Sequence, residues 1–329
     1  MSENRIKAAV IGLGEHGRNH ARQYQAIPGA ELAGVYDLRP ERRAQAAAEL
    51  GVRAFSSLDE VWQAAQAVSV VIPATSHAAV AREAFRRGVD VLLEKPITRT
   101  LEEAQEIIQL ASEHGRILQV GHIERFNPGA VAAKAITRHP LFFEIHRLGV
   151  FSPRSLDVDV VFDLMIHDLD LLLWMVSSPV REVRAVGLPV LSDKVDIANA
   201  RVEFEDGAVA NLTASRVSTE KVRKFRYFQP NEYISIDFSR RDVLVVSASH
   251  AEGSPQLGFN KLETQPVEPL RAELEAFVDS VRGRKPPLVG GPEGAKALAL
   301  AVQVMDCIEA HAAKVNFRLT QPPGQSGES

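Results

Sequence analysis

The first 120 residues alternate short apolar, β-rich runs with amphipathic helical runs, and this alternation constrains the fold more than any other feature of the chain. Such a rhythm is typical of parallel strands joined by crossover helices. The expected strands are 6–12, 30–37, 69–75, 90–96 and 116–122, and the expected helices are 15–27, 40–51, 77–88 and 101–115. The pattern predicts an α/β domain with a doubly wound parallel sheet over residues 1–121.

The pattern changes after residue 122. Alternating polar and apolar residues predict strands over 142–151, 181–191, 197–216 and 224–246, with a hairpin turn at Asp206-Gly207. Two helical runs start near Pro269 and Pro292. We therefore predict an α+β domain with a large, mainly antiparallel open sheet over 122–318. The Pro-, Gly- and Ser-rich end predicts a flexible tail over 319–329.

Composition excludes several classes of partner. Charged residues make up 24% of the 329 residues and the formal net charge is −4, so the chain has no electrostatic footprint for nucleic acid or an anionic membrane. No apolar run reaches membrane-spanning length and no targeting segment is evident, so we expect a cytoplasmic protein. The single cysteine, Cys307, rules out an internal disulfide and a cysteine-based zinc site.

A glycine-rich turn, "VIGLGEHG", follows the first expected strand and opens the first helix. Its Gly12, Gly14 and Gly17 have G-x-G-x-x-G spacing. Glycines here permit a tight turn and let the backbone approach a pyrophosphate, whose charge is favoured by free N–H groups at the helix start. The context predicts a dinucleotide-binding Rossmann domain.

Asp37 ends the second expected strand, 20 residues beyond the last glycine of this motif. A carboxylate there can accept hydrogen bonds from the ribose hydroxyls of NAD and repel the extra phosphate of NADP. Arg39 and Arg42 stand close by and could soften this preference. We therefore predict NAD as the cofactor, with NADP possible.

The stretch "LLEKPIT" places Glu94 and Lys95 at the carboxyl end of a buried strand, the edge where open parallel sheets bind their ligands. A lysine there can point into the cleft beside the nicotinamide and exchange a proton. The alternative is a surface ion pair between Glu94 and another residue.

The stretch "PATSH" lies between a strand and a helix, so Thr75 and Ser76 can cap that helix while their hydroxyls face the cofactor. Capping alone is the simpler interpretation.

The segment "VFDLMIHDLDLLLWMV", residues 161–176, is apolar enough for a core helix, yet it carries three aspartates and a histidine. At about 100° per residue, Asp163, His167, Asp170 and Trp174 fall within roughly 60° of one another, while Asp168 lies off that stripe. We predict that the stripe lines a cleft. Alternatively, His167 is a core histidine held by Asp163. A metal site is a third interpretation, but no other histidine is placed to complete it, and we expect no metal.

The loop "GHIERFNP" supplies groups suited to a phosphorylated substrate. Arg125, Asn127 and Arg154 offer cations and amide donors, and guanidinium groups suit diphosphate oxygens. Arg125 could instead pair with Glu124 or cap a helix. His122 and Glu124 could line a sugar pocket or only order the loop.

In this order and at these separations, "GLGEHG", "EKPIT" and "DLMIHDLD" resemble the Gfo/Idh/MocA family of NAD(P)-dependent sugar and polyol oxidoreductases, over essentially the whole chain except its tail. The resemblance implies that Lys95, Asp163 and His167 are catalytic and surround the substrate hydroxyl. The predicted cofactor-binding set is Gly12, Gly14, His16, Gly17, Asp37, Arg39, Ala74, Thr75, Ser76, His77, Glu94 and Lys95. The predicted substrate-binding set is Lys95, His122, Glu124, Arg125, Asn127, Arg154, Asp163 and His167.

Within the family, "QVGHIERFNP" and "SPRSLDVDVVFDLMIHDLDLL" are similar to a narrower group that oxidises the C3 hydroxyl of UDP-N-acetylglucosamine with transfer of hydride to NAD. In that group an aminotransferase acts next. The segment "DVDVVFD" replaces the glycine-rich approach of many family members. Oxidation of a free polyol or aldose, such as inositol, stays open, as does a non-catalytic protein that senses NAD and sugar. The family resemblance also implies a homo-oligomer, either a dimer or a tetramer.

Overall fold

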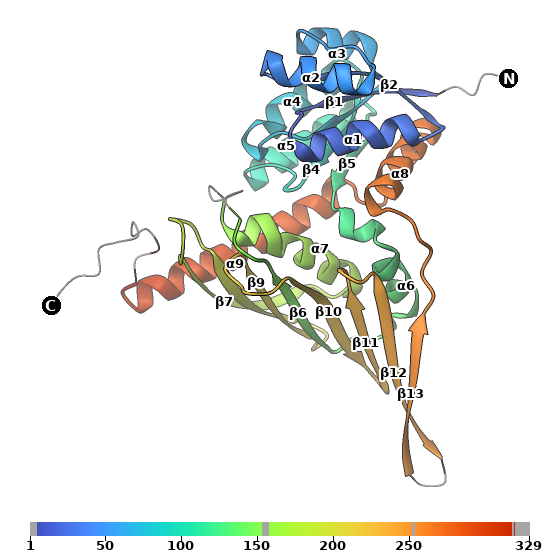
Figure 1. Ribbon diagram of the computed structural model, residues 1–329. Coiled ribbons are helices and arrows are strands. Elements are labelled where there is room, and N and C mark those ends of the chain that lie inside the picture. The colour runs from blue at the N-terminus through green and yellow to red at the C-terminus, as the bar shows by residue number, and fades with distance from the viewer. Residues whose placement is uncertain (1–4, 153–157, 252–253, 318, 320–329) are drawn as a thin grey trace. The chain divides into compact units, whose positions relative to one another are not determined.

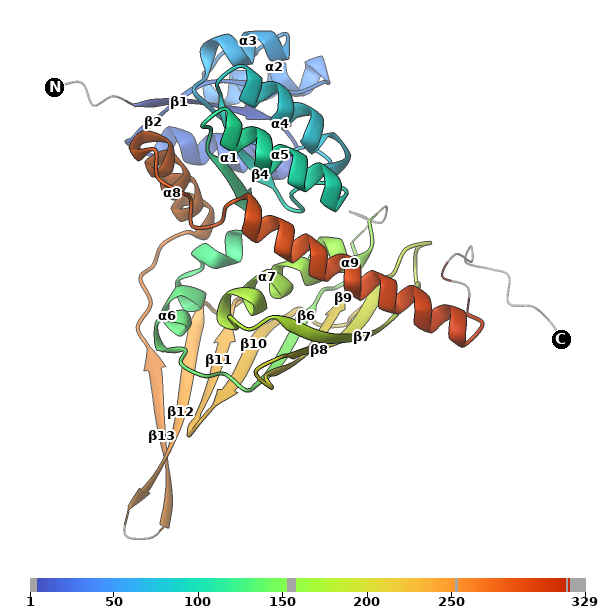
Figure 2. The same cartoon turned by 180° about the vertical axis from the view of Figure 1, so that it is seen from behind.

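The computed structural model describes residues 5–152, 158–251, 254–317 and Leu319. The chain forms two compact units (Figures 1 and 2). The first unit contains Met1–Phe126 and Val267–Leu298, and the second contains Asn127–Pro266 and Ala299–Ser329.

The first unit is built on a five-stranded parallel sheet in the order β2-β1-β3-β4-β5. Its strands are β1 (Ile6–Ile11), β2 (Ala30–Tyr36), β3 (Ala67–Val70), β4 (Asp90–Glu94) and β5 (Leu118–Gly121). The central strands β3 and β4 are buried along their whole length, as expected for strands covered on both faces. The predicted doubly wound α/β domain is confirmed.

Five helices connect these strands: α1 (Glu15–Ala26), α2 (Pro40–Leu50), α3 (Leu58–Ala64), α4 (His77–Arg86) and α5 (Leu101–Glu113). Local signals explain several of their ends. Gly51 ends α2 in the left-handed conformation at φ 65°, and Thr100 with Glu103 forms a capping box at the start of α5. Helix α3 was not predicted, although Ser57 caps it by accepting a hydrogen bond from the Glu60 N–H.

Helix α8 (Pro269–Gly283) belongs to the first unit. Its Leu274, Phe277 and Val278 are buried in the same hydrophobic core as Val10 and Tyr24. The sequence analysis had placed this helix in the second domain, because chain order alone does not reveal which core a late amphipathic helix packs against. Helix α9 (Gly291–Lys314) divides between the units after Leu298.

The second unit contains an eight-stranded, mainly antiparallel sheet in its described part, in the order β13-β12-β11-β10-β6-β9-β8-β7. Only the β6–β9 pair is parallel within this described sheet. The strands are β6 (Phe142–Leu148), β7 (Val180–Leu188), β8 (Ile197–Phe204), β9 (Val209–Ser215), β10 (Val222–Gln229), β11 (Glu232–Asp237), β12 (Asp242–Ala251) and β13 (Ser254–Leu262). The predicted sheet is confirmed, as is the Asp206-Gly207 turn, where Gly207 has φ 89°. The edge strand β13 was not predicted.

Helices α6 (Pro128–Ile136) and α7 (Ile166–Met175) lie over one face of this sheet (Figures 1 and 2). Alternation along the strands explains the two faces: Phe143, Phe225 and Tyr227 are fully buried, while Phe228 is 39% exposed. The predicted tail at 319–329 lies outside the described residues except for Leu319. None of the described helices has the length and apolar content needed to cross a membrane.

Candidate functional site

The glycine-rich turn joins β1 to α1 and has no room for side chains at two positions. Gly12 has φ +94°, and a Cβ there would lie 2.1 Å from the Val71 carbonyl oxygen. A Cβ on Gly17 would lie 1.9 Å from the Gly12 carbonyl oxygen. Gly14, the N-cap of α1, has open space around it and makes no side-chain cap. The N-terminus of α1 is therefore accessible to an anion at this turn.

Asp37 follows β2 and anchors the loops on both sides of the predicted ribose site. Its Oδ2 accepts a hydrogen bond from the Leu13 N–H at 2.8 Å, and its Oδ1 accepts one from the Arg39 N–H at 2.9 Å. The side chain is 8% exposed. Both oxygens keep lone pairs available, so the carboxylate can still accept bonds from hydroxyl groups.

A cavity of about 600 Å³ opens at the carboxyl ends of β1, β2 and β3. Several members of the predicted cofactor set line it, and so do residues that the sequence analysis left out of that set, such as Leu58 and Val80. Neither of those two carries a local motif that would have indicated the role. The lining residues are Ile11, Gly12, Leu13, Gly14, Tyr36, Asp37, Leu38, Arg39, Arg42, Leu58, Val71, Ile72, Pro73, Ser76, Ala79 and Val80.

The predicted capping role of the "PATSH" segment is wrong. Ala74, Thr75 and Ser76 form a 3-10 turn, and Ser76, at the N-cap of α4, makes no side-chain hydrogen bond to the helix. The 3-10 turn runs directly into α4, so the backbone is already helical before α4 begins and no side-chain cap forms at Ser76. Ser76 is exposed and lines the cavity.

His77 is fully buried and contacts both the loop after β3 and the loop after β4. Its Nδ1 lies 3.0 Å from the Pro96 carbonyl oxygen and its Nε2 lies 2.9 Å from that of Ile72. Burial lowers the pKa of His77, against the effect of these carbonyl groups. Through its contact with the Pro96 carbonyl group, His77 holds the loop that follows Lys95.

Glu94, the last residue of β4, is the centre of a partly buried polar cluster with two histidines of α1. His16 and His20 each place Nε2 near Glu94 Oε1, at 3.0 Å and 3.2 Å. Burial opposes ionisation of Glu94, but the hydrogen bonds from both histidines outweigh it and hold its pKa well below the usual range. The Glu94 hydrogen bond raises the pKa of His16, whereas burial lowers that of His20. The sequence analysis missed His20, although its i+4 spacing from His16 on a helix was a signal.

Lys95 follows this cluster at the start of a cis Lys95–Pro96 peptide. Its backbone N–H donates a hydrogen bond of 3.3 Å to Glu94 Oε2, and the residue is partly exposed. The Glu94 carboxylate therefore contacts the main chain that presents the predicted catalytic lysine. The interpretation of Glu94 as half of a surface ion pair is wrong, since Glu94 is 8% exposed.

The loop after β5 contains buried polar and charged side chains. His122, Glu124 and Arg125 are 1%, 8% and 5% exposed. Asn127 caps α6 by accepting a hydrogen bond from the Gly129 N–H at 3.0 Å. The second arginine predicted for diphosphate contact, Arg154, lies outside the described residues.

In the second unit, the predicted helix over 161–176 begins with a π-helical turn at Val161–Met165 and continues as α7. Asp163 lies in the π turn, so the α-helical angle used to align it with His167 does not hold across this step. Asp163, His167 and Trp174 are partly exposed, whereas Asp170 is 1% exposed. π turns are frequent at functional sites, because they shift side chains relative to the regular helix.

Asp168 lies off the predicted stripe, and the structure explains its burial. Arg147 of β6 donates from Nε to Oδ2 and from Nη2 to Oδ1, both at 2.8 Å. Each side chain is 4% exposed. This bidentate pair anchors the helix that carries His167 to the sheet.

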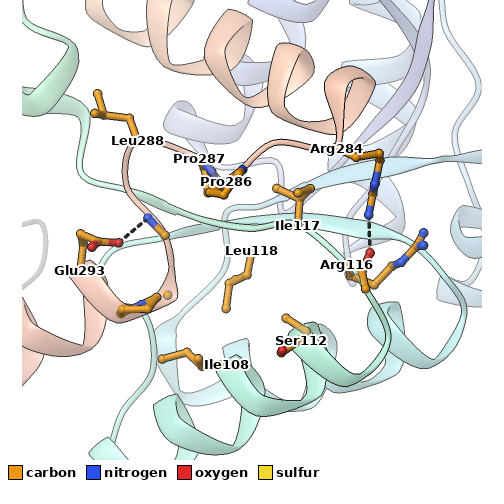
Figure 3. A pocket seen from close by; sticks show the side chains of 15 residues that line it. Ile108, Ser112, Arg116, Ile117, Leu118, Arg284, Pro286, Pro287, Leu288 and Glu293 are labelled. Carbon is orange, nitrogen blue, oxygen red and sulfur yellow. Dashed lines mark hydrogen bonds between the residues drawn. The ribbon is translucent and has the colours of Figure 1, made fainter.

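Another cavity, of about 580 Å³, lies at the opposite edge of the first sheet, where β5 begins (Figure 3). Ile108 and Leu118 form part of its apolar wall, and Glu293 accepts a hydrogen bond from the Gly290 N–H at 3.0 Å. The predicted site residues do not line it.

Comparison with known proteins agrees with this architecture. Residues 6–122 match a family described as oxidoreductase family, NAD-binding Rossmann fold, and residues 140–229 match the GFO/IDH/MocA C-terminal domain. The chain is 41% identical to UDP-N-acetylglucosamine 3-dehydrogenase of Acidithiobacillus ferrooxidans over 93% of this chain and 98% of that protein. It is 27% identical to scyllo-inositol 2-dehydrogenase (NAD(+)) of Bacillus subtilis over 87% of this chain and 89% of that protein.

Solved structures show the same fold. A structure of the Acidithiobacillus ferrooxidans enzyme has a TM-score of 0.87 at 40% identity, and the match covers 93% of this chain and 98% of that one. Levoglucosan dehydrogenase in complex with NADH and levoglucosan has a TM-score of 0.84 over 93% of this chain and 98% of that one, but its 19% identity indicates the fold alone. With both domains matched in order, the chain belongs to the GFO/IDH/MocA family of oxidoreductases and is an NAD-dependent dehydrogenase.

Proposed function

We propose that the protein oxidises the C3 hydroxyl of UDP-N-acetylglucosamine with NAD as hydride acceptor. The observation that carries this proposal is the 41% identity to UDP-N-acetylglucosamine 3-dehydrogenase along 98% of that protein. The inositol dehydrogenase relative has 27% identity, so a free polyol is the less supported substrate.

In the proposed reaction the first unit binds the cofactor. The glycine turn and the N-terminus of α1 accommodate the pyrophosphate, and Asp37 accepts hydrogen bonds from the ribose hydroxyls. The predicted cofactor contacts of His16, Arg39, Ala74, Thr75, Ser76, His77, Glu94 and Lys95 belong to this proposal. When bound, NAD supplies the acceptor for the C3 hydride.

The chain itself supplies the proton acceptor. We assign removal of the C3 hydroxyl proton to Lys95 or His167, with Asp163 orienting the imidazole and stabilising its cationic form. The partial exposure of Lys95, Asp163 and His167 supports this role, because a general base must reach the substrate.

Recognition of the nucleotide part is proposed for the loop after β5. Arg125 and Arg154 are assigned to the diphosphate, since planar guanidinium groups bind phosphate oxygens with two hydrogen bonds. His122, Glu124 and Asn127 are assigned to the sugar pocket. Burial of His122 and Glu124 supports a shaped polar site rather than a solvated loop.

NADH formation, measured by absorbance with a panel of UDP-sugars, free hexoses and inositols, tests cofactor and substrate together. We expect turnover with UDP-N-acetylglucosamine and little with the unphosphorylated compounds. Preferential turnover of an inositol would overturn the substrate assignment, and NAD binding without turnover of any compound would favour a sensor.

Substitution of the two candidate bases tests the mechanism. Lys95→Ala and His167→Ala should each lower kcat by roughly two orders of magnitude or more, the usual scale for acid–base groups, while NAD binding is largely retained. The exposed Lys285→Ala and His139→Ala are matched controls and should keep wild-type turnover. Unchanged turnover in both test variants would remove the assignment.

We further propose that the protein is a homo-oligomer, a dimer or a tetramer. The sheet face opposite α6 and α7 carries a row of aromatic contacts, Phe142 to Phe228 at 5.7 Å and Phe228 to Tyr233 at 4.9 Å. Light scattering of the wild type and of Phe228→Glu tests this, and a wild-type monomer would contradict it.

The 3-keto product suits a following aminotransferase. We propose a cytoplasmic location, because the proposed reaction uses NAD and a nucleotide sugar.

A further inference from the structure

The side chains of His16, His20 and Glu94 form a cluster, hereafter the His–His–Glu cluster, whose geometry resembles a metal-binding site. His16 and His20 are four residues apart on α1, so both project from the same helix face. Glu94 reaches them from the end of β4. One ligand atom from each residue lies within 4.8 Å of the others.

The distances between these atoms match one face of a zinc tetrahedron. The two Nε2 atoms are 3.3 Å apart, and they lie 3.0 Å and 3.2 Å from Glu94 Oε1. Ligands at the usual zinc distances of about 2.0–2.2 Å are separated by roughly 3.3–3.6 Å in a tetrahedral site. An ion just off the plane of these three atoms, toward the fourth coordination position, would need only a small outward movement of each ligand.

The surroundings of Glu94 hold its carboxylate in place. Its Oε2 accepts the Lys95 N–H, the kind of outer hydrogen bond that orients ligating carboxylates. A Cβ on Gly121 of β5 would lie 2.7 Å from Oε1, so glycine at this position leaves room for the carboxylate.

The histidines differ in a way that suits a site with one open position. The His20 side chain is fully buried, and Nε2 makes its polar contacts, since Nδ1 has no hydrogen-bond partner within the described chain. The His16 side chain is 45% exposed. Water or a ligand can therefore complete a four-coordinate site from the side of His16.

We propose that the His–His–Glu cluster binds one divalent transition-metal ion of the zinc class. Two imidazoles and one carboxylate favour zinc, cobalt or nickel over magnesium and calcium, which prefer all-oxygen ligands. The cluster shares His16 and Glu94 with the proposed cofactor-binding set, but no step of the proposed dehydrogenation requires the metal ion.

Cobalt(II) is a direct probe, because tetrahedral Co²⁺ gives strong visible bands that its octahedral aqueous form lacks. The full-length chain, without a polyhistidine tag and stripped with a chelator, is titrated with Co²⁺, and Zn²⁺ binding is measured by calorimetry. We expect one ion per chain and a tetrahedral Co²⁺ spectrum that Zn²⁺ displaces.

Matched variants locate the site. His16→Asn and Glu94→Gln should weaken binding by at least roughly 10–100-fold, the loss seen even for outer partners of ligands. The exposed His139→Asn should bind like the wild type. His16→Asn is the primary variant because substitution of the buried His20 risks the fold, and circular dichroism verifies folding. Absence of binding, an octahedral Co²⁺ spectrum, or equal affinity in His16→Asn and His139→Asn overturns the proposal. None of these readouts depends on dehydrogenase activity.

Discussion

Removal of Arg147 tests how the second unit holds the helix that carries His167. Arg147 and Asp168 form two hydrogen bonds of 2.8 Å, and both side chains are 4% exposed. Arg147→Met would leave the Asp168 carboxylate buried without its guanidinium partner. Breaking a buried pair from one side costs about 3–5 kcal/mol, because the desolvation penalty of the remaining charge is no longer offset.

Urea unfolding measures this loss. At an m-value of about 2 kcal/mol/M, a loss of about 3–5 kcal/mol lowers the midpoint by roughly 1.5–2.5 M. The two tryptophans of the chain lie in different units, Trp62 in α3 and Trp174 in α7. A Trp62→Phe background therefore makes the fluorescence report on the second unit alone.

An exposed pair with the same bidentate geometry is the control. Arg82 donates to Glu106 at 2.8 Å and 2.7 Å, but the side chains are 31% and 45% exposed, so Arg82→Met should cost no more than about 1 kcal/mol. It is measured in a Trp174→Phe background, where Trp62 reports on the first unit. Adding Asp168→Asn to Arg147→Met should recover part of the loss. Equal small losses in Arg147→Met and Arg82→Met would refute the reasoning.

Two further predictions concern the first unit. Asp37→Ser should weaken NAD binding roughly tenfold or more, since a hydrogen bond to a charged group contributes about 1.5–3 kcal/mol. The same substitution should raise the use of NADP relative to NAD. Steady-state kinetics with both cofactors test this, and an unchanged ratio of kcat/KM for NADP to kcat/KM for NAD would contradict it. Burial lowers the pKa of His77 in the folded protein. As pH falls, the His77 side chain is therefore protonated in the unfolded chain before it is protonated in the folded one. The free energy of unfolding should decline below about pH 6.5, by at most about 1.4 kcal/mol per pH unit. Thermal unfolding against pH should show a shallower decline in His77→Gln than in the exposed control His139→Gln.

Features encoded by neighbouring residues were predictable from the sequence. The glycine spacing and the strand–helix rhythm predicted the tight turn between β1 and α1, and Gly12 and Gly17 have no space for a side chain in the structure. Asp37 and Gly51 occupy the places that their local context indicated. These signals are local because backbone conformation and strand alternation depend on a few adjacent residues.

Features that depend on distant residues were not predictable. The sequence indicated that Asp168 differs from its neighbours, but only the fold pairs it with Arg147, 21 residues away. The π turn at Val161–Met165 changes the spacing that an ordinary helix would give Asp163 and His167.

The placement of α8 in the first core and the meeting of Glu94 with His16 and His20 were likewise decided by tertiary structure. Local sequence determined which segments become strands, helices and turns. Packing decided which charges are buried together, because that choice depends on the surroundings of each group after the elements assemble.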